Sequence, residues 1–422
     1  MTRVHYSLYD RMLSEERLHN GFVRVKSAKG AAGVDGQSIE DFSEDLAQNL
    51  AILVKELKDK TYRPQPVKRV EIPKAGGGKR LLGIPSVRDR VVQQALLEIL
   101  QPIFDPDFHP SSYGYRPGRS AHQAISKAAM FIRKYELCWV VDMDISKCFD
   151  NLDHYIIIKA FRRRVADGSI LKLVGMFLES GVMIGQNWQA TKVGSPQGGV
   201  ISPLIANVYL DAFDQFMMGR QHRIVRYADD ILILTRSKSA AVNAQERATR
   251  FLERELKLTV NRQKTHIVHC DEGVKFLGVI LHTTHTLIQK DKVTGFKERV
   301  RRITRRNSPV NLEKVIEDLN PVCRGFVNYF RIANCTKLLH RLAKWIRRRL
   351  RAKQLALWKM PGRLHRRLRQ RGYTGEFRSI KMRSWRSSAS PQASMALPNK
   401  YFGELGLYDL DSVRTGISVS VC

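Results

Sequence analysis

The 422-residue sequence lacks several features that would identify a secreted, zinc-binding or membrane protein. Its six cysteines include no Cys-x-x-Cys pair, which argues against a zinc ribbon and against a disulfide framework. No apolar run approaches the length of a membrane span, and the first residues lack the apolar segment of a signal peptide. We therefore expect a reduced, cytoplasmic protein with no membrane partner.

Acidic residues are also scarce, because 40 Asp and Glu stand against 72 Lys and Arg, for a net charge of +32. Such an excess is costly through self-repulsion unless a polyanion neutralises it, and nucleic acid is the obvious candidate. Residues 297–371 alone hold 23 Lys and Arg against four acids, with aromatic residues interleaved. A charge run is usually a solvated surface, but this excess is larger than solubility requires. We expect nucleic-acid contacts from Arg347, Arg348, Arg349 and Arg351.

Helical and strand patterns alternate up to about residue 290, and helical patterns alone follow. Ser38 and Ser86 are predicted to cap helices. VKRVEIPK (67–74) and KRLLGIP (79–85) flank a Gly-rich turn and predict a hairpin. LCWVVDMDI (137–145) predicts a buried strand. The mixture predicts an α+β fold with a basic, all-helical region after it.

The stretch RIVRYADDILILT (223–235) places two adjacent carboxylates between two apolar strands. Asp229 and Asp230 are expected at the hairpin tip, and Asp142 and Asp144 share one face of the strand at 137–145. An isolated Asp-Asp pair is usually a solvated turn. A second acidic strand and the basic composition favour a site where carboxylates converge around Mg²⁺, which prefers oxygen ligands. Two such ions can support phosphoryl transfer.

The stretch RYADDILIL resembles the catalytic motif of reverse transcriptases. Further stretches occur in the order found in reverse transcriptases encoded by bacterial group II introns: VKRVEIPKAGGGKRLLGIPSVRDRVVQQAL, SSYGYRPGRSAHQAI, VVDMDISKCFDNLDH, GSPQGGVISPLIANVYLD, LKLTVNRQKT and VKFLGVIL. LNPVCRGFVNYFRIANCTKLLHRLAKWIRRRL resembles the maturase-specific thumb of the same family. The length, the C-terminal sequence and the lack of a recognisable HNH nuclease module are most similar to the group IIC class.

The resemblance implies a right-hand polymerase fold, whose palm carries an antiparallel sheet. It predicts an N-terminal helical extension at 1–60, fingers and palm at 61–288, a helical thumb or maturase-specific RNA-binding domain at 289–377, and a Ser/Arg-rich linker and C-terminal tail at 378–422. The implied partners are group II intron RNA, an RNA template, a DNA primer or target DNA, and dNTPs, in the bacterial cytoplasm or nucleoid. The implied cofactor is Mg²⁺ as two ions, with Mn²⁺ as a substitute.

The same resemblance implies a role for individual residues. The metal-binding and catalytic carboxylates are expected to be Asp144, Asp229 and Asp230, whereas Asp142 is expected either to support the metal ligands from outside or to be structural. The residues expected to contact the dNTP are Lys74, Arg80, Phe149, Gln197 and Lys264. Phe149 excludes the ribose 2′-hydroxyl in this interpretation, and Lys264 protonates the leaving pyrophosphate. A primer grip is expected at Phe276, Leu277 and Gly278, and template contacts at Tyr113, Arg116 and Arg119.

The function implied is RNA-directed DNA synthesis, with intron RNA binding that assists splicing and mobility. Two alternatives remain at this stage. One is an RNA-binding splicing cofactor without significant polymerase activity, and the other is an RNA-dependent RNA polymerase. Primer extension on an RNA template distinguishes the splicing cofactor, which adds no nucleotides, from an active polymerase. The choice between dNTPs and rNTPs in a Phe149 variant tests whether the enzyme makes DNA or RNA.

Overall fold

The computed structural model describes residues 3–73, 79–185, 187–191, 193–196, 198–377 and 385–416, and for Arg80 the backbone alone. The chain divides into two compact units, Met1–His269 and Cys270–Cys422. The boundary predicted between residues 288 and 289, which separates the palm from the thumb, stays a prediction. The two compact units divide earlier, after His269, because a small sheet that begins at Val274 packs with the helices of the second unit.

The first unit begins with helices that pack on a long central helix. They are α1 (Tyr9–Met12), α2 (Glu15–Ala28), α3 (Ile39–Glu44) and α4 (Leu46–Lys58), and the central helix is α5 (Val87–Phe104). The predicted caps are confirmed, since Ser38 and Ser86 accept hydrogen bonds from the Asp41 and Asp89 amides. Two helices rather than one follow Ser38, because the chain leaves helical geometry at Asp45.

The predicted hairpin at 67–85 is confirmed in the residues that the structure describes. Strand β1 (Val67–Pro73) pairs with β2 (Lys79–Ile84) in antiparallel register. Short strands β4 (Val182–Ile184) and β5 (Asn187–Gln189) extend this sheet in the order β2-β1-β4-β5. Sequence reasoning did not identify β4 or β5, which are too short to give a periodic signal.

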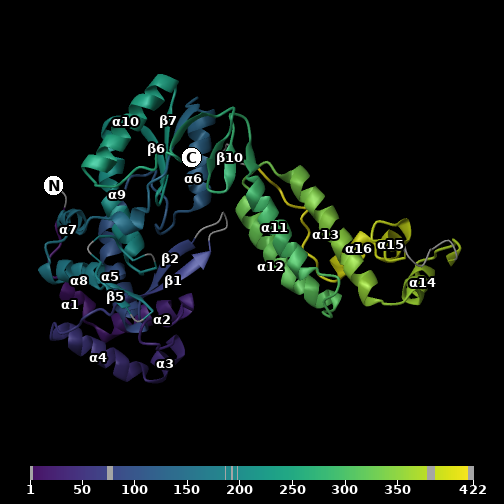
Figure 1. Cartoon of the computed structure of the whole chain (residues 1–422), viewed down its shortest axis with the longest axis horizontal. Coiled ribbons are helices and arrows are strands. Elements are labelled where there is room, and N and C mark those ends of the chain that lie inside the picture. The colour runs from purple at the N-terminus through teal and green to yellow at the C-terminus, as the bar shows by residue number, and fades with distance from the viewer. Residues whose placement is uncertain are drawn as a thin grey trace. The chain divides into compact units, whose positions relative to one another are not determined.

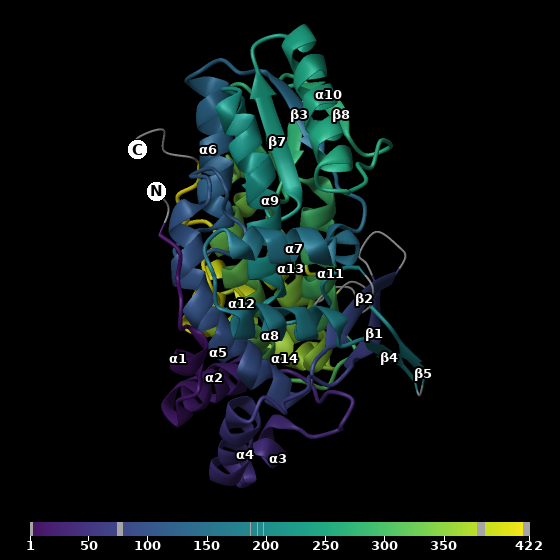
Figure 2. The same ribbon diagram turned by 90° about the vertical axis from the view of Figure 1, so that its left-hand side faces the viewer.

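A second sheet carries the acidic residues, with strand order β6-β7-β3-β8. Its strands are β3 (Trp139–Met143), β6 (Arg223–Tyr227), β7 (Asp230–Thr235) and β8 (His266–His269), and all its pairings are antiparallel. Helices α6 (Ala121–Arg133), α9 (Ser202–Gly219) and α10 (Lys238–Arg254) pack against it (Figures 1 and 2). The remaining elements of the unit are the 3-10 turns η1 (Asp105–Asp107) and η2 (Cys148–Asn151) and the helices α7 (His154–Arg162) and α8 (Gly168–Glu179).

The second unit is a three-stranded sheet followed by helices. The sheet has the order β11-β10-β9, built from β9 (Val274–Phe276), β10 (Val279–Leu281) and β11 (Thr286–Ile288). The helices are α11 (Lys290–Ile303), α12 (Leu312–Phe330), α13 (Thr336–Leu357), α14 (Pro361–Gln370), α15 (Pro391–Ala396) and α16 (Asn399–Glu404). Helix α12 continues through Pro321. Within the described residues, every helix is too short or too polar to cross a lipid bilayer.

The predicted linker after residue 377 contains more structure than expected. Trp385 is buried, and α15 and α16 follow it. Ala393, Ala396 and Phe402 are buried as well, so these short helices belong to the core of the second unit.

Candidate active site

The two adjacent aspartates lie at a tight hairpin turn between β6 and β7. Tyr227 pairs with Asp230, so that Ala228 and Asp229 form a two-residue turn. Ala228 has a φ of 57°, a value at which hairpin turns usually have Gly, Asn or Asp. Asp229 is half-buried, whereas Asp230 keeps solvent-accessible surface although protein atoms crowd its carboxyl group. The apolar residues of both strands are buried, so burial fixes the register and with it the position of the turn.

Asp144 comes to the same turn through the register of the central strand. Asp142 of β3 pairs with Leu232, and Met143 pairs with Ile231. Asp144 is the next residue after β3, and it lies close enough to Asp230 for the two carboxylates to interact. The Asp144 backbone is fixed from the other side, since its amide donates to Thr265 Oγ1 (3.2 Å) and its carbonyl accepts from the Asn261 amide (2.8 Å). The expected convergence of the two acidic strands is therefore present.

The proximity of these carboxylates changes their electrostatics. Loss of hydration in the crowded turn, and then the charges of Asp229, Asp142 and Asp144, raise the pKa of Asp230 to about 6. Lys264 opposes this shift in pKa. Its ammonium nitrogen lies 3.5 Å from Asp144 Oδ2. The turn therefore concentrates negative charge, with one lysine as a nearby counter-charge.

The donor set fits hard divalent ions. No group of three or more His, Cys, Asp or Glu side chains within the described ranges is close enough to hold a metal ion by itself. Mg²⁺ is usually held by one or two carboxylates together with water and substrate phosphates. Asp144 and Asp229, with Asp230 near them, could supply oxygen donors of that kind.

Phe149 lies in η2, directly after the acidic strand, and is half-buried. The ring of Tyr115 meets it edge to face, with ring centroids 6.2 Å apart and planes at 78°. Tyr115 itself is 51% exposed and has a φ of 59°. Sequence reasoning singled out Phe149 but missed Tyr115, whose approach depends on how a distant loop folds.

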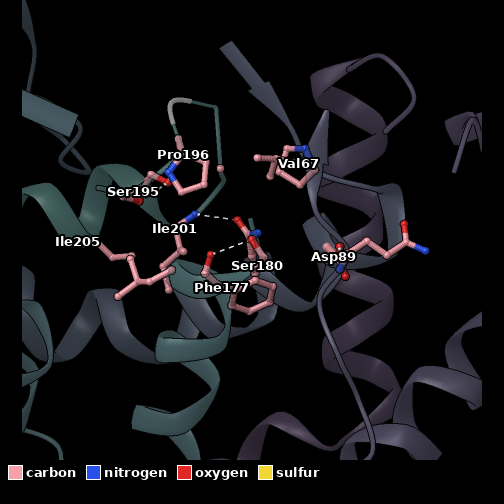
Figure 3. Close-up of a pocket in the computed structure, with 14 residues that line it drawn as sticks. Val67, Asp89, Phe177, Ser180, Ser195, Pro196, Ile201 and Ile205 are labelled. Atoms are coloured by element: carbon pink, nitrogen blue, oxygen red, sulfur yellow. Dashed lines mark hydrogen bonds between the residues drawn. The ribbon is translucent and has the colours of Figure 1, made fainter. Parts of the chain in front are cut away.

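The other expected dNTP contacts are less well defined. Lys74 and Gln197 lie outside the described residues, and the backbone of Arg80 is in β2 opposite Ile72. The residues around Gln197 are packed on β2, because a Cβ at Gly198 would lie 2.3 Å from the Gly83 carbonyl oxygen. Figure 3 shows Ser195, Pro196 and Ile201 around a cavity in this region. Its volume is ≈ 10 Å³, too small for a nucleotide.

The expected template-facing residues differ in their surroundings. The Arg116 side chain is 4% exposed and forms an ion pair with Asp105. It also donates to the carbonyls of His109 and Ser112. Tyr113 is buried as well. The internal contacts of Arg116 and the burial of Tyr113 favour a structural role in the loop for both residues. Arg119 is exposed and stacks over Tyr113, with its guanidinium carbon 5.6 Å from the ring centroid.

The residues of the expected primer grip form the β9–β10 turn of the second unit. Phe276 is only 4% exposed and belongs to the core. Leu277 and Gly278 have φ values of 46° and 82°, as in a type I′ hairpin. Tyr329 donates to the Leu277 carbonyl (2.9 Å), and a Cβ at Gly278 would lie 3.3 Å from the Phe330 ring. Helix α12 thus fixes the turn, a contact that sequence reasoning did not anticipate.

The four arginines expected to bind nucleic acid lie on α13, and three of them have partners within the unit. Arg347 pairs with Asp411 at 2.9 Å. Arg349 donates to Thr304, and Arg351 donates to the Leu397 carbonyl and to Asn399. Arg348 is exposed. Its position suits contact with an external polyanion better than those of the other three.

The most prominent polar group near the turn was also missed. Arg226 and Asp214 are both fully buried and form an ion pair at 2.6 Å, and Asn207 joins them. The available signal was a charged residue inside the apolar strand RIVRY and an aspartate within an apolar helix. Such residues must find buried partners, but sequence spacing does not identify which ones.

Two family models match the chain. Reverse transcriptase (RNA-dependent DNA polymerase) matches residues 72–281, and the maturase-specific domain of group II introns matches residues 293–372. Protein YkfC of Escherichia coli (strain K12) is 37% identical over 303 residues, which cover 63% of this chain and 78% of that protein. Group II intron-encoded protein LtrA of Lactococcus lactis subsp. cremoris is 30% identical over 340 residues, which cover 64% of this chain and 56% of that protein. The chain therefore belongs to the group II intron-encoded reverse transcriptases, RNA-dependent DNA polymerases that carry a maturase-specific domain, bind nucleic acid and use divalent metal ions.

Proposed function

We propose that this chain extends a DNA primer on an RNA template at the turn formed by Ala228 and Asp229, and that it binds group II intron RNA to assist splicing and mobility. The observation that carries the proposal is the pairing of β3 with β7, which brings Asp144, the residue after β3, and Asp229 close enough to Asp230 to act on its charge. Three carboxylates at one turn, in a chain with a net charge of +32, suit a reaction between polyanionic substrates.

Asp144, Asp229 and Asp230 are proposed to hold two Mg²⁺ ions, for which Mn²⁺ can substitute. When bound, such ions activate an attacking hydroxyl and stabilise charge on a leaving oxygen. In the reaction, the primer 3′-hydroxyl loses its proton to solvent and its oxygen forms a bond to the α-phosphorus of the dNTP. The bond from that phosphorus to the bridging oxygen breaks. Pyrophosphate leaves and takes a proton from Lys264, whose ammonium group lies 3.5 Å from Asp144.

Other residues are proposed to bind and select the substrate. Lys74 and Arg80 neutralise the triphosphate, and Gln197 contacts the sugar and base. Phe149 occupies the space of a ribose 2′-hydroxyl, supported by its position directly after the acidic strand and by its contact with Tyr115. Leu277 and Gly278 contact the primer strand.

Binding of intron RNA is assigned to the basic helices of the second unit. The match of residues 293–372 to the maturase-specific domain supports this assignment, as does the exposed Arg348 on α13. Arginine side chains release counterions from phosphates and stack on unpaired bases.

Primer extension by the pure protein tests the proposal. With an RNA template, a DNA primer, dNTPs and Mg²⁺, we expect incorporation that Asp229→Asn reduces by at least about 100-fold. Asp59→Asn is the matched control, because Asp59 is an exposed carboxylate at the end of α4. Wild-type protein that binds intron RNA but adds no nucleotide would contradict the polymerase function, as would an Asp229→Asn protein with full activity.

A further inference from the structure

A buried ion pair lies beneath the acidic turn. Arg226 of β6 and Asp214 of α9 are both 0% exposed. The arginine Nε donates to both carboxylate oxygens at 2.9 Å, and Nη2 donates to Oδ2 at 2.6 Å. Apolar residues of similar volume are often at least as stabilising as a buried ion pair, because two charges must lose their hydration. Stability alone therefore does not account for this pair.

The third nitrogen of Arg226 is directed to the turn itself. Nη1 donates to the Ala228 carbonyl at 3.0 Å and to Asn207 Oδ1 at 3.0 Å. This carbonyl belongs to the peptide group that joins Ala228 to Asp229. Its orientation sets the direction in which the Asp229 side chain leaves the backbone. The φ of 57° at Ala228 is uncommon for a residue with a Cβ, so the turn depends on contacts that favour it.

The same cluster is joined to the loop before α6. Asn207 is buried, and its Nδ2 donates to the Gly114 carbonyl at 2.8 Å. A Cβ at Gly114 would lie 2.2 Å from the Ala228 nitrogen, so this loop packs directly on the turn. Two backbone hydrogen bonds of 2.9 Å, between Arg226 and residues 111 and 113, hold the loop along β6. Tyr115, which meets Phe149, follows at once.

We infer that Arg226, Asp214 and Asn207 form a positioning cluster, which sets the Ala228–Asp229 peptide so that the Asp229 carboxylate is aligned with Asp144 for metal binding. This role rests on the proposed polymerase function. Arginine is needed because its planar guanidinium can hold the carboxylate through two nitrogens and still donate from a third. A lysine keeps the charge but loses this geometry.

Removing the ion pair as a unit tests the role. In the double variant Arg226→Met/Asp214→Leu, no charge is left unpaired, so the protein is expected to fold and to melt near the wild-type temperature. The Ala228 carbonyl loses its donor, and misplacement of a reacting group by about 1 Å costs about 100-fold in rate. We expect kcat for primer extension to fall by about that factor, and the Mg²⁺ concentration that gives half-maximal activity to rise. The affinity for the primer–template, measured without dNTPs, should not change.

A second variant keeps the test decisive if the double variant does not fold. Asn207→Ala leaves the ion pair intact but removes the contacts to Arg226 and to the Gly114 carbonyl. It is expected to raise half-saturating Mg²⁺ in the same direction. Tyr62→Phe is the control for a general loss of stability, because it removes a buried 2.6 Å hydrogen bond to Asp89 away from the turn. It should lower the melting temperature without changing the Mg²⁺ requirement.

Two outcomes separate this inference from the proposed function. In the first outcome, wild-type protein and Asp59→Asn extend primers, and Asn207→Ala and a folded double variant do so at the same rate and with the same Mg²⁺ requirement. The positioning role is then wrong and the polymerase function stands. If wild-type protein does not extend primers at all, the proposed function fails first.

Discussion

The Lys264 ammonium nitrogen lies 3.5 Å from the Asp144 carboxylate. Lys264 is exposed on its other sides and follows Asn261, whose amide holds the Asp144 carbonyl. Without bound metal, its charge partly offsets that of the acidic turn. In the proposed reaction, the same ammonium group moves to the leaving pyrophosphate, since lysine has a long and flexible side chain.

The first prediction concerns this lysine. Lys264→Gln is expected to reduce the single-turnover rate of dNTP incorporation by about 100-fold, because proton donation by a positioned acid contributes at least that much. The fall of the incorporation rate at high pH, which reports loss of the Lys264 proton, should be absent in this variant. Lys58→Gln, an exposed lysine of α4, serves as control. A Lys264→Gln enzyme with an unchanged pH profile would exclude the acid role.

The second prediction concerns the raised pKa of Asp230 in metal-free protein. Its folded-state pKa of about 6 lies above the ordinary value of 3.8, so the folded chain binds the proton more tightly than the unfolded chain. Ionisation therefore destabilises the fold as pH rises from 3.8 through about 6. Asp230→Asn mimics the neutral form. In EDTA at about pH 8, the melting temperature of Asp230→Asn should be higher than that of wild type. Below the unfolded-state pKa of the aspartate, the two melting temperatures should be equal. An equal or lower melting temperature of the variant at about pH 8 would contradict the raised pKa.

The main elements around the active site could be predicted from the sequence. The apolar runs on both sides of Asp229 fix a hairpin by burial alone, and the i, i+2 spacing of Asp142 and Asp144 fixes their shared face. Ser38 and Ser86 could be assigned as caps because capping depends on local chemistry. These signals depend on neighbouring residues, and the hairpin and both caps were confirmed.

The contacts that support the site could not be predicted in the same way. Asp214 lies 12 residues from Arg226, and Asn207 lies 93 residues from Gly114. Pairings of this kind depend on how helices and loops pack, which no periodicity records. The side-chain environment of Arg116 shows the same limit, because the family resemblance suggested a template contact but the loop buries the side chain against Asp105.

The third prediction concerns sugar selection. Phe149→Val should raise the use of rNTPs relative to dNTPs by about tenfold or more, because space for a 2′-hydroxyl opens. Tyr115→Leu should give a smaller change in the same direction, since the edge-to-face contact with Phe149 is lost. Tyr115→Phe keeps the ring and should behave like wild type. Competition between rNTPs and dNTPs in primer extension measures all three, and unchanged selection in Phe149→Val would count against the gate.

The fourth prediction separates RNA-binding arginines from structural ones on α13. Arg348→Gln should lower the affinity for intron RNA and reduce the slope of log affinity against log salt by about 1, because one phosphate contact is lost. Arg351→Gln should instead lower the melting temperature, since it removes donors to the Leu397 carbonyl and Asn399. Equal salt slopes for wild type and Arg348→Gln would place the RNA contact elsewhere.

The fifth prediction concerns the turn at Leu277 and Gly278. Gly278→Ala places a Cβ at a φ of 82° and 3.3 Å from the Phe330 ring, so it should destabilise the second unit by about 1–2 kcal/mol. Primer extension should fall further than this loss of stability explains, because a shifted turn can no longer hold the primer strand.

Gly295→Ala is the matched control for that variant. Gly295 lies in α11 with nothing within 4 Å of an added Cβ, and alanine favours a helix over glycine by up to about 1 kcal/mol. This variant should therefore melt at or above the wild-type temperature and keep its activity. Tyr329→Phe removes the hydrogen bond to the Leu277 carbonyl without adding bulk. If it lowers the affinity for primer–template as Gly278→Ala does, the geometry of the turn controls primer binding. A Gly278→Ala protein that binds and extends primers normally would show that this turn does not contact the primer.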